Sequence, residues 1–297
     1  MSQDRMLLKR DIKEKKELVN IEMDRFLPRK DEYPKQIHKA IRHSLFAGGK
    51  RLRPYLLLHT YLLFGVETKK ILPVAGALEM LHTYTLIHDD LPEIDNDDYR
   101  RGKKSCHVVY GSDIALLAGD SLLVSAVEAI NSAEINDKLK LQLLREFCIE
   151  TGHRGLIAGQ MVDIESEGKK IKEKTLNYIH TNKTGRLINL SIRFGCILGK
   201  ASEADTENMR IFGDKIGLAF QIIDDILDIE GDEITLGKST GKDSQQKKAT
   251  YPSLNGLEES RQMAEKLISD ARARLVRYGE KAIYLDLLAE FLLTRKY

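Results

Sequence analysis

The chain has few of the residues that form sheets or cross-links. Of its 297 residues, only six are prolines and three are cysteines. With so few prolines and little alternation of β-branched residues, the chain leaves no room for a substantial sheet. The cysteines stand alone, with no Cys-x-x-Cys pair, which predicts reduced structural thiols in a cytosolic protein (Cys106, Cys148 and Cys196).

Long apolar runs and a charge excess are absent as well. The longest apolar stretch, residues 114–130, contains Asp120 and Glu128, so no segment is expected to span a membrane. Residues 1–16 are highly charged and do not read as a secretory leader. The formal net charge of +2 is too balanced to predict a nucleic-acid partner. We therefore expect a cytoplasmic protein that does not bind nucleic acid.

Helical periodicity fills most of the chain. Apolar residues recur with a period of about 3.6 residues, and no linker or low-complexity tract interrupts them. The expected helices cover residues 10–25, 34–46, 52–64, 70–90, 112–132, 137–166, 173–199, 204–230, 257–278 and 281–294. The pattern predicts an all-α protein, and at this length either one large domain or two small ones would fit.

The second of two aspartate-rich clusters has helical spacing. Gln221, Asp224, Asp225 and Asp228 fall at i, i+3, i+4 and i+7 and therefore share one face of a helix. The flanking residues are apolar on nearly every other side, whereas a surface helix would show a broad polar face. The sequence predicts a buried helix whose narrow acidic stripe faces a cavity.

The first cluster, Asp89, Asp90 and Asp95, is less regular. Asp89 and Asp95 are six residues apart and would point in different directions on an ideal helix. Because Pro92 interferes with helix geometry, we expect the helix to end or bend near Asp90 and to let Asp95 swing back toward Asp89. The loop residues that follow are expected to be solvated (Asn96 and Asp97).

Neighbouring carboxylates in apolar sequence need a cation. Such groups repel one another and lose hydration on burial. Mg²⁺ suits carboxylate oxygens and commonly arrives with substrate phosphates, so the two clusters predict one cavity lined from opposite sides. Cationic residues nearby suit two phosphorylated ligands, one held through metal and one held directly. Lys50 and Arg53, three residues apart, are expected on one face of a helical turn, with Arg51 pointing elsewhere.

In these segments the sequence resembles the trans-prenyl diphosphate synthases of the short-chain bacterial type. The segments are GGKRLRP (48–54), HTYTLIHDDLPEIDNDDYRRGK (82–103), KTG (183–185), QIIDDILD (221–228) and LGKSTGKDSQQKKATYP (236–252). They follow the order and spacing of the family over most of the chain. Glu93, Ile94 and Lys104 depart from the usual pattern, at positions where no metal or phosphate role is expected.

The resemblance implies the isoprenoid synthase fold, an antiparallel helical bundle around a central active-site cavity, as a single domain over residues 1–297. It implies a homodimer that uses isoprenoid diphosphates and three Mg²⁺ ions per active site. The implied reaction condenses isopentenyl diphosphate head-to-tail with dimethylallyl or geranyl diphosphate, through ionisation, condensation and elimination.

The resemblance also implies roles for individual residues. Both acid clusters would ligate metal (Asp89, Asp90, Asp95, Asp224, Asp225 and Asp228). Isopentenyl diphosphate would be bound by a basic group (Lys50, Arg53, His82 and Arg101). The allylic diphosphate would be bound by a second group (Arg100, Lys183, Thr184, Gln221, Lys238 and Lys248). Within that group, Lys183 would act on the leaving diphosphate, and Thr184 and Gln221 would stabilise the carbocation.

Product length is expected to depend on the helical turn before the first acid cluster. Thr85 lies about one turn, roughly 5.4 Å, from Asp89, and Tyr84 is its neighbour. By resemblance, an aromatic residue five positions before the first aspartate, with two extra residues inside the motif, is typical of bacterial farnesyl diphosphate synthases. A geranylgeranyl diphosphate synthase is the alternative. A class I terpene cyclase or a non-catalytic synthase subunit fits less well, because both acid clusters are intact.

Overall fold

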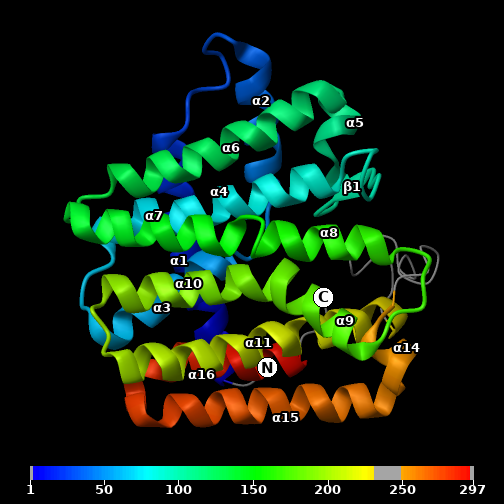
Figure 1. The fold of residues 1–297 in the computed structure, drawn as a ribbon. Helices are drawn as coiled ribbons and strands as arrows, with labels where there is room; N and C mark the ends of the chain where they lie inside the picture. The colour runs from blue at the N-terminus through cyan, green and yellow to red at the C-terminus, as the bar shows by residue number, and fades with distance from the viewer. Residues whose placement is uncertain (1–2, 231–248, 295–297) are drawn as a thin grey trace. The chain divides into compact units, whose positions relative to one another are not determined.

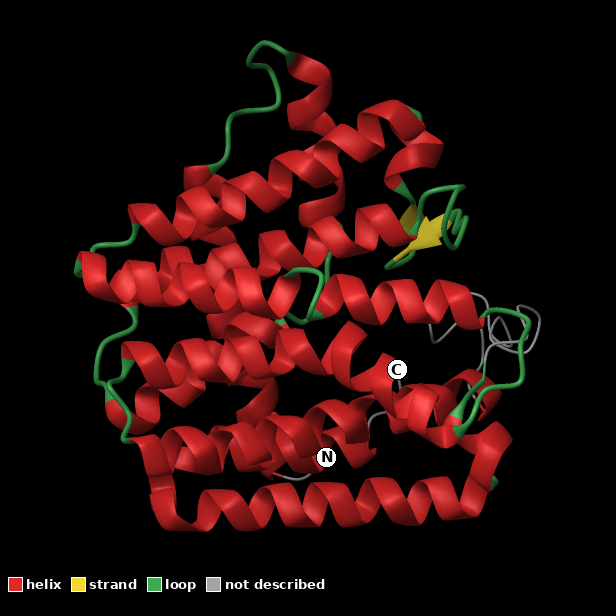
Figure 2. Ribbon diagram, in the orientation of Figure 1, coloured by secondary structure: helices red, strands yellow, loops and turns green. Residues whose placement is uncertain are grey.

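Helices make up almost all of the structure, a computed structural model that describes residues 3–230 and 249–294 (Figures 1 and 2). The sheet content of these ranges is one antiparallel hairpin, formed by β1 (Tyr99–Arg100) and β2 (Lys103–Lys104). The prediction of an all-α protein is therefore confirmed. Among the helices of the same ranges, none has the combined length and apolar character that crossing a bilayer requires.

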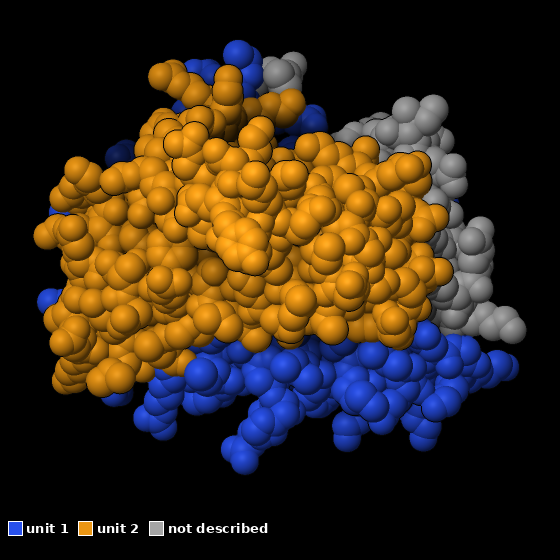
Figure 3. All heavy atoms as spheres, turned by 90° about the horizontal axis from the view of Figure 1, so that it is seen from above, with its two compact units in different colours: residues 1–8, 59–66, 145–297 blue, residues 9–58, 67–144 orange. Residues whose placement is uncertain are grey.

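The residues fall into two compact units, coloured separately in Figure 3. Unit 1 contains residues 1–8, 59–66 and 145–297, and unit 2 contains residues 9–58 and 67–144. Some helices contribute residues to both units, namely α1 (Gln3–Phe26), α3 (Leu52–Phe64) and α7 (Asp137–Thr151). The expectation that residues 1–297 form a single domain stays a prediction.

Unit 2 contains the mostly buried helix α4 (Leu72–Asp89), which packs along α6 (Ser112–Ser132). Pro73 lies in the first turn of α4, where its missing N–H removes no helical hydrogen bond. A Cβ atom on Gly119 of α6 would lie 2.2 Å from the His88 ring of α4, so glycine permits this close approach. The remaining elements are α2 (Lys35–Leu45), η1 (Lys69–Ile71) and α5 (Cys106–Tyr110).

Unit 1 contains the long helix α11 (Glu203–Glu230), which packs against α10, α15 and η2. Of the apolar residues that were expected to bury its C-terminal half, Ile222, Ile223 and Ile226 are buried, whereas Ile229 is 57% exposed. The other elements are α8 (Leu156–Ser166), α9 (Glu173–Ile179), η2 (His180–Gly185), α10 (Arg186–Leu198), α14 (Tyr251–Asn255), α15 (Leu257–Leu275), η3 (Val276–Ala282) and α16 (Ile283–Thr294).

Two of the expected helices are interrupted. The range 137–166 was expected to be continuous, but α7 and α8 are separated by a turn that ends at Gly155. A Cβ on Gly155 would lie 2.1 Å from the Glu150 carbonyl oxygen, so the turn depends on glycine. The range 173–199 was also expected to be regular, but its middle, η2, is a π-helix.

Candidate active site

The first acid cluster lies where α4 ends in unit 2. The helix ends at Asp89, and Asp90 is its C-cap. The backbone N–H of Asp95 then donates a hydrogen bond to the Asp89 carbonyl oxygen at 2.8 Å. The predicted bend near Asp90 and the return of Asp95 toward Asp89 are therefore confirmed. The side chains of Asp89 and Asp95 are only partly buried.

The middle aspartate of this cluster points into the protein. Asp90 is 3% exposed, and its carboxylate accepts hydrogen bonds from Arg100, including one from Nε at 2.8 Å. Burial raises the pKa of Asp90, and the Arg100 charge opposes that rise. Arg100 also pairs with Asp97 at 2.9 Å. Asp97 is buried, so its expected solvation was wrong, whereas Asn96 is exposed as expected.

Basic residues gather around His82 in the same unit. Burial lowers the pKa of His82 well below its usual value, and the positive charges of Arg53, Arg101, Arg100 and Arg51 lower it further. The imidazole is therefore neutral at pH 7, and its Nδ1 has no hydrogen-bond partner in the described part of the chain. A neutral imidazole among guanidinium groups suits a polyanion such as a diphosphate, which would relieve the positive charge.

The segment that contains Lys50, Arg51 and Arg53 is not one continuous helical turn. Helix α3 begins only at Leu52, and Arg51 has a left-handed backbone with φ of 54°. Lys50 and Arg53 therefore do not belong to one helical turn, and that expectation was wrong. Arg51 was expected to point elsewhere, and it is buried, with 3% exposure.

The residues assigned to product length lie on α4. The Tyr84 ring meets the His88 ring edge-on, with centroids 4.7 Å apart. Burial raises the pKa of the Tyr84 phenol, and the carboxylates of Asp120 and Asp89 raise it further. The Thr85 hydroxyl donates to the carbonyl three residues before it at 2.8 Å.

The second acid cluster borders a cavity of ≈ 200 Å³ in unit 1. Its lining includes residues from α8, η2 and α11, and from the segment that precedes α14 (Asp163, His180, Lys183, Gln221, Asp224, Asp225 and Thr250). The structure therefore brings together Lys183, Gln221 and the second aspartate pair, which were assigned to one site from sequence. Thr184 is partly buried beside Lys183 in η2, and Asp228 is buried.

Glycines allow η2 to approach its neighbours closely. A Cβ on Gly159 of α8 would lie 2.3 Å from the Lys183 backbone nitrogen, and one on Gly217 of α11 would lie 3.2 Å from the Gly185 Cα. Lys183 then reaches Asp163, with Nζ 2.7 Å from Oδ2. Asp163 was missed from sequence, because its isolated acidic side chain carries no recognisable spacing.

Asp225 is engaged inside unit 1. It is 7% exposed, and its Oδ2 accepts a hydrogen bond from the Tyr251 backbone N–H at 2.9 Å. The same oxygen lies 3.5 Å from His180 Nε2. The Tyr251 ring stacks on His180, with centroids 5.5 Å apart, and its hydroxyl hydrogen-bonds to Asn177. Burial raises the pKa of Tyr251 to about 12.

The acidic side chains suit a metal that arrives with its ligand. Over residues 3–230 and 249–294, no group of three or more His, Cys, Asp or Glu side chains is arranged to hold a metal ion alone. Mg²⁺ usually keeps one or two protein carboxylates and takes its other oxygens from water and phosphate. Partly exposed carboxylates at Asp89, Asp95 and Asp224 fit that donor set.

Some expectations are not addressed by these contacts. Lys238 and Lys248 lie outside the described residues. The expectation that both acid clusters line one cavity stays a prediction.

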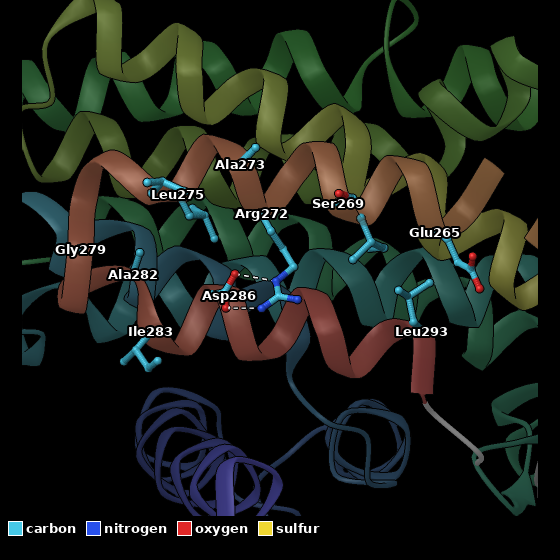
Figure 4. A pocket seen from close by; sticks show the side chains of 12 residues that line it. Glu265, Ser269, Arg272, Ala273, Leu275, Gly279, Ala282, Ile283, Asp286 and Leu293 are labelled. Carbon is cyan, nitrogen blue, oxygen red and sulfur yellow. Dashed lines mark hydrogen bonds and ion pairs between the residues drawn. The ribbon is translucent and has the colours of Figure 1, made fainter. Parts of the chain in front are cut away.

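A larger hollow lies between α15 and α16 in unit 1 (Figure 4). Its volume is ≈ 580 Å³, and Arg272 pairs there with both carboxylate oxygens of Asp286, at 2.7 and 2.8 Å. None of the residues assigned from sequence lines it. The sequence therefore predicts no role for this hollow.

Comparisons with known proteins agree with these features. Residues 34–281 match the family model described as polyprenyl synthetase. The geranylgeranyl diphosphate synthase of Cyanophora paradoxa is 45% identical over 285 residues, which cover 95% of this chain and 94% of that protein. The farnesyl diphosphate synthase of Geobacillus stearothermophilus is 45% identical over 251 residues, which cover 83% of this chain and 84% of that protein.

A solved structure of a geranyltransferase from Helicobacter pylori, complexed with magnesium and isoprenyl diphosphate, is also similar. The TM-score is 0.85 at 27% sequence identity, and the match covers 99% of this chain and 97% of that one. The two sequence relatives share the same percentage identity with this chain but have different products in their names. Overall identity therefore does not decide product length.

Proposed function

This chain belongs to the polyprenyl synthetase family as a short-chain prenyl diphosphate synthase with the isoprenoid synthase fold, and we propose that its product is farnesyl diphosphate. The allylic substrates would be dimethylallyl and geranyl diphosphate, each extended by isopentenyl diphosphate. The observation that carries this choice of product is Tyr84, a partly buried aromatic side chain five residues before Asp89 on α4.

We assign isopentenyl diphosphate to the basic cluster of unit 2. Lys50, Arg53, His82 and Arg101 would hold its diphosphate directly. Guanidinium groups form short, charge-assisted hydrogen bonds to phosphate oxygens. The arginines around His82 support the assignment: burial is the main cause that lowers the pKa of His82, their positive charges lower it further, and a diphosphate would offset these charges.

We assign the allylic diphosphate to the cavity of unit 1. Lys183 would donate to the leaving diphosphate after exchanging its present partner, Asp163. In unit 2, Asp89 and Asp95, and in unit 1, Asp224, are the carboxylates that we propose as Mg²⁺ ligands. Bound Mg²⁺ would supply Lewis-acid neutralisation of the charge that develops on the diphosphate. Three ions per site remain a prediction.

The chemistry requires stabilisation of charge on both fragments. When the allylic carbon–oxygen bond breaks, its electron pair leaves with the diphosphate, where Lys183 and Arg100 would stabilise it. The Thr184 hydroxyl and the Gln221 amide would direct their oxygen dipoles toward the allylic cation. The double bond of isopentenyl diphosphate then attacks, and proton loss to the released diphosphate completes the condensation.

The direct test supplies the purified protein with Mg²⁺, labelled isopentenyl diphosphate and, in separate reactions, five-, ten- and fifteen-carbon allylic diphosphates. Products are dephosphorylated and sized by chromatography. We expect accumulation at fifteen carbons and refusal of the fifteen-carbon starter. A twenty-carbon product would keep the enzyme class but reject the farnesyl assignment. No incorporation from any starter would favour a cyclase or a non-catalytic subunit.

Replacing Tyr84 tests the side chain itself. We expect Tyr84→Ala to shift the product from fifteen toward twenty carbons, because a smaller side chain leaves room for a longer tail. Tyr33→Ala, at a tyrosine that is 93% exposed, is the matched control and should leave the product distribution unchanged. A fifteen-carbon product from Tyr84→Ala would show that another residue limits the chain.

We also propose a homodimer. Helix α6 exposes the apolar side chains Leu116, Leu117 and Val124, and association with a second copy would remove them from water. Light scattering after size-exclusion chromatography measures the assembly, with Leu117→Glu as the variant. We expect a dimer that this substitution weakens, whereas a wild-type monomer would reject the proposal. The cytoplasmic location stays a prediction.

A further inference from the structure

A buried carboxylate in unit 2 joins two arginines that are far apart in the sequence. Glu79 lies in the middle of α4 and is 1% exposed. Its Oε1 accepts hydrogen bonds from Arg51 Nη1 at 2.8 Å and from Arg101 Nη2 at 3.2 Å. A buried charge is tolerated only where it is paired and hydrogen-bonded, so the position of Glu79 depends on both guanidinium groups.

Both arginines have an unusual backbone conformation. Arg51 has φ of 54° and Arg101 has φ of 55°, in the left-handed region that β-carbon sterics disfavour. Such conformations persist where surrounding contacts over-determine them, and they concentrate at functional sites. Here both strained residues direct their side chains to the same carboxylate.

The two guanidinium groups differ in their other partners. Arg51 is buried, and it also donates to the Leu45 carbonyl oxygen at 2.6 Å and to Asn20 Oδ1 at 3.0 Å. Arg101 remains partly exposed and donates through Nη1 to the Gly48 carbonyl oxygen at 3.1 Å. The Arg51 guanidinium is therefore hydrogen-bonded within the protein interior. The Arg101 guanidinium is hydrogen-bonded to Glu79 and Gly48 and remains partly exposed to solvent.

A glycine lies against the Arg101 guanidinium. A Cβ on Gly49 would lie 2.7 Å from Arg101 Cζ and 3.0 Å from Nε. Any other residue at this position would therefore displace the guanidinium. Gly49 itself has φ of 94°, so the loop uses glycine both for its own backbone and for contact with Arg101.

We propose that Glu79 and Gly49 are positioning residues that fix the guanidinium plane of Arg101 for the diphosphate of isopentenyl diphosphate. The inference rests on the proposed function, which assigns this ligand to Arg101. A guanidinium recognises phosphate through donors in a fixed plane, so its orientation affects affinity as much as its charge does. Neither positioning residue needs to touch the ligand, since both act through Arg101.

The test compares kinetic constants of Glu79→Gln and Gly49→Ala. We expect the KM for isopentenyl diphosphate to rise by roughly tenfold to a hundredfold, as for loss of one hydrogen bond to a charged group. The KM for geranyl diphosphate should change by less than about threefold, because Glu79 and Gly49 contact Arg101, which is assigned to isopentenyl diphosphate, and neither is assigned to the allylic diphosphate. Gly168→Ala is the control, since Gly168 also has positive φ, at 67°, but a Cβ there would meet no atom within 4 Å.

An Arg101→Ala background tests whether both residues act through this arginine. If they do, adding Gly49→Ala or Glu79→Gln should not raise the KM for isopentenyl diphosphate further. Equal increases in both KM values, together with a lower thermal midpoint, would reduce Glu79 to a structural role and overturn the proposal. An unchanged KM in Gly49→Ala would also overturn it, and this variant remains decisive if Glu79→Gln does not fold.

The wild-type reaction separates failure of this inference from failure of the proposed function. If the wild-type enzyme does not incorporate isopentenyl diphosphate, the proposed function fails. Incorporation by the wild type, with no selective rise in KM in the variants, rejects only the positioning role.

Discussion

At the scale of single residues, adjacent aspartates in the same cluster have different surroundings. Asp89 and Asp224 are partly exposed, whereas Asp90 and Asp225 are buried against partners within the protein. Successive residues on an α-helix point about 100° apart, so two neighbours in one cluster can differ in exposure even where both line a cavity, as Asp224 and Asp225 do. The shared residue type does not imply a shared role.

This difference predicts unequal effects of two amide substitutions. We expect Asp224→Asn to lower kcat by about 10²–10³, as for loss of a key electrostatic group. Asp225→Asn should lower kcat by less than about tenfold, because an amide oxygen can still accept the Tyr251 N–H. Steady-state kinetics over a range of Mg²⁺ concentrations measures both. If Asp225→Asn instead raises the Mg²⁺ requirement as much as Asp224→Asn, then Asp225 acts on the metal.

Residue types and spacing predicted the acid clusters and the return of Asp95, since both depend on local chain geometry. They did not identify Glu79 or Asp163, whose partners are distant in sequence. They also placed Asp97 in solvent, although Arg100 draws it into the interior. Side-chain partners across long sequence separations are set by tertiary packing, which one-dimensional periodicity does not contain.

At the scale of elements, the π-helix η2 depends on close contact with α8. A π-helix inserts an extra residue per turn and is often found at functional sites. Here it carries Lys183 and Thr184, and Gly159 of α8 lies against the Lys183 backbone. The Lys183 backbone cannot rotate away as the tip of a side chain can. A Cβ atom added at Gly159 would therefore push η2 away from α8.

Gly159→Ala is therefore expected to destabilise the fold and to displace Lys183. Overpacking of this kind costs about 1–3 kcal/mol, and we expect a lower thermal midpoint together with a higher KM for geranyl diphosphate. Gly213→Ala in α11 is the matched helical control, because its nearest neighbour is the Asn189 side-chain oxygen. Equal losses in both variants would show that packing volume, and not displacement of η2, explains the effect.

Helix periodicity predicted most elements but not their interruptions. The apolar pattern resumes after residues 152–155 and after η2, so residues 137–166 and 173–199 read as single helices. The turn between α7 and α8 ends at Gly155, which lies so close to the Glu150 carbonyl oxygen that a Cβ would clash with it. The short elements α5 and α14 and the β1–β2 hairpin contain too few residues to show a period.

At the scale of the whole molecule, the net charge of +2 conceals strong local separation of charge. Unit 2 gathers arginines around His82, and both units carry partly exposed aspartates. Repulsion between the aspartates and the diphosphate anion opposes binding of diphosphate alone, and it is relieved when Mg²⁺ accompanies the anion. Metal and diphosphate should therefore stabilise the folded protein together more than the sum of their separate effects.

Thermal unfolding with Mg²⁺, with inorganic diphosphate and with both measures this coupling. A ligand present at one hundred times its Kd stabilises the native state by about 2.7 kcal/mol, which for a protein of 297 residues raises the Tm by roughly 4 °C. We expect a smaller shift with diphosphate alone, through the basic group of unit 2, and the full shift only when both are present, so EDTA should remove the difference. Asp224→Asn should reduce the joint shift while leaving the Tm in plain buffer nearly unchanged. If diphosphate alone produced the full shift, the basic side chains would be sufficient to hold it, and the assignment of the carboxylates to Mg²⁺ would be wrong.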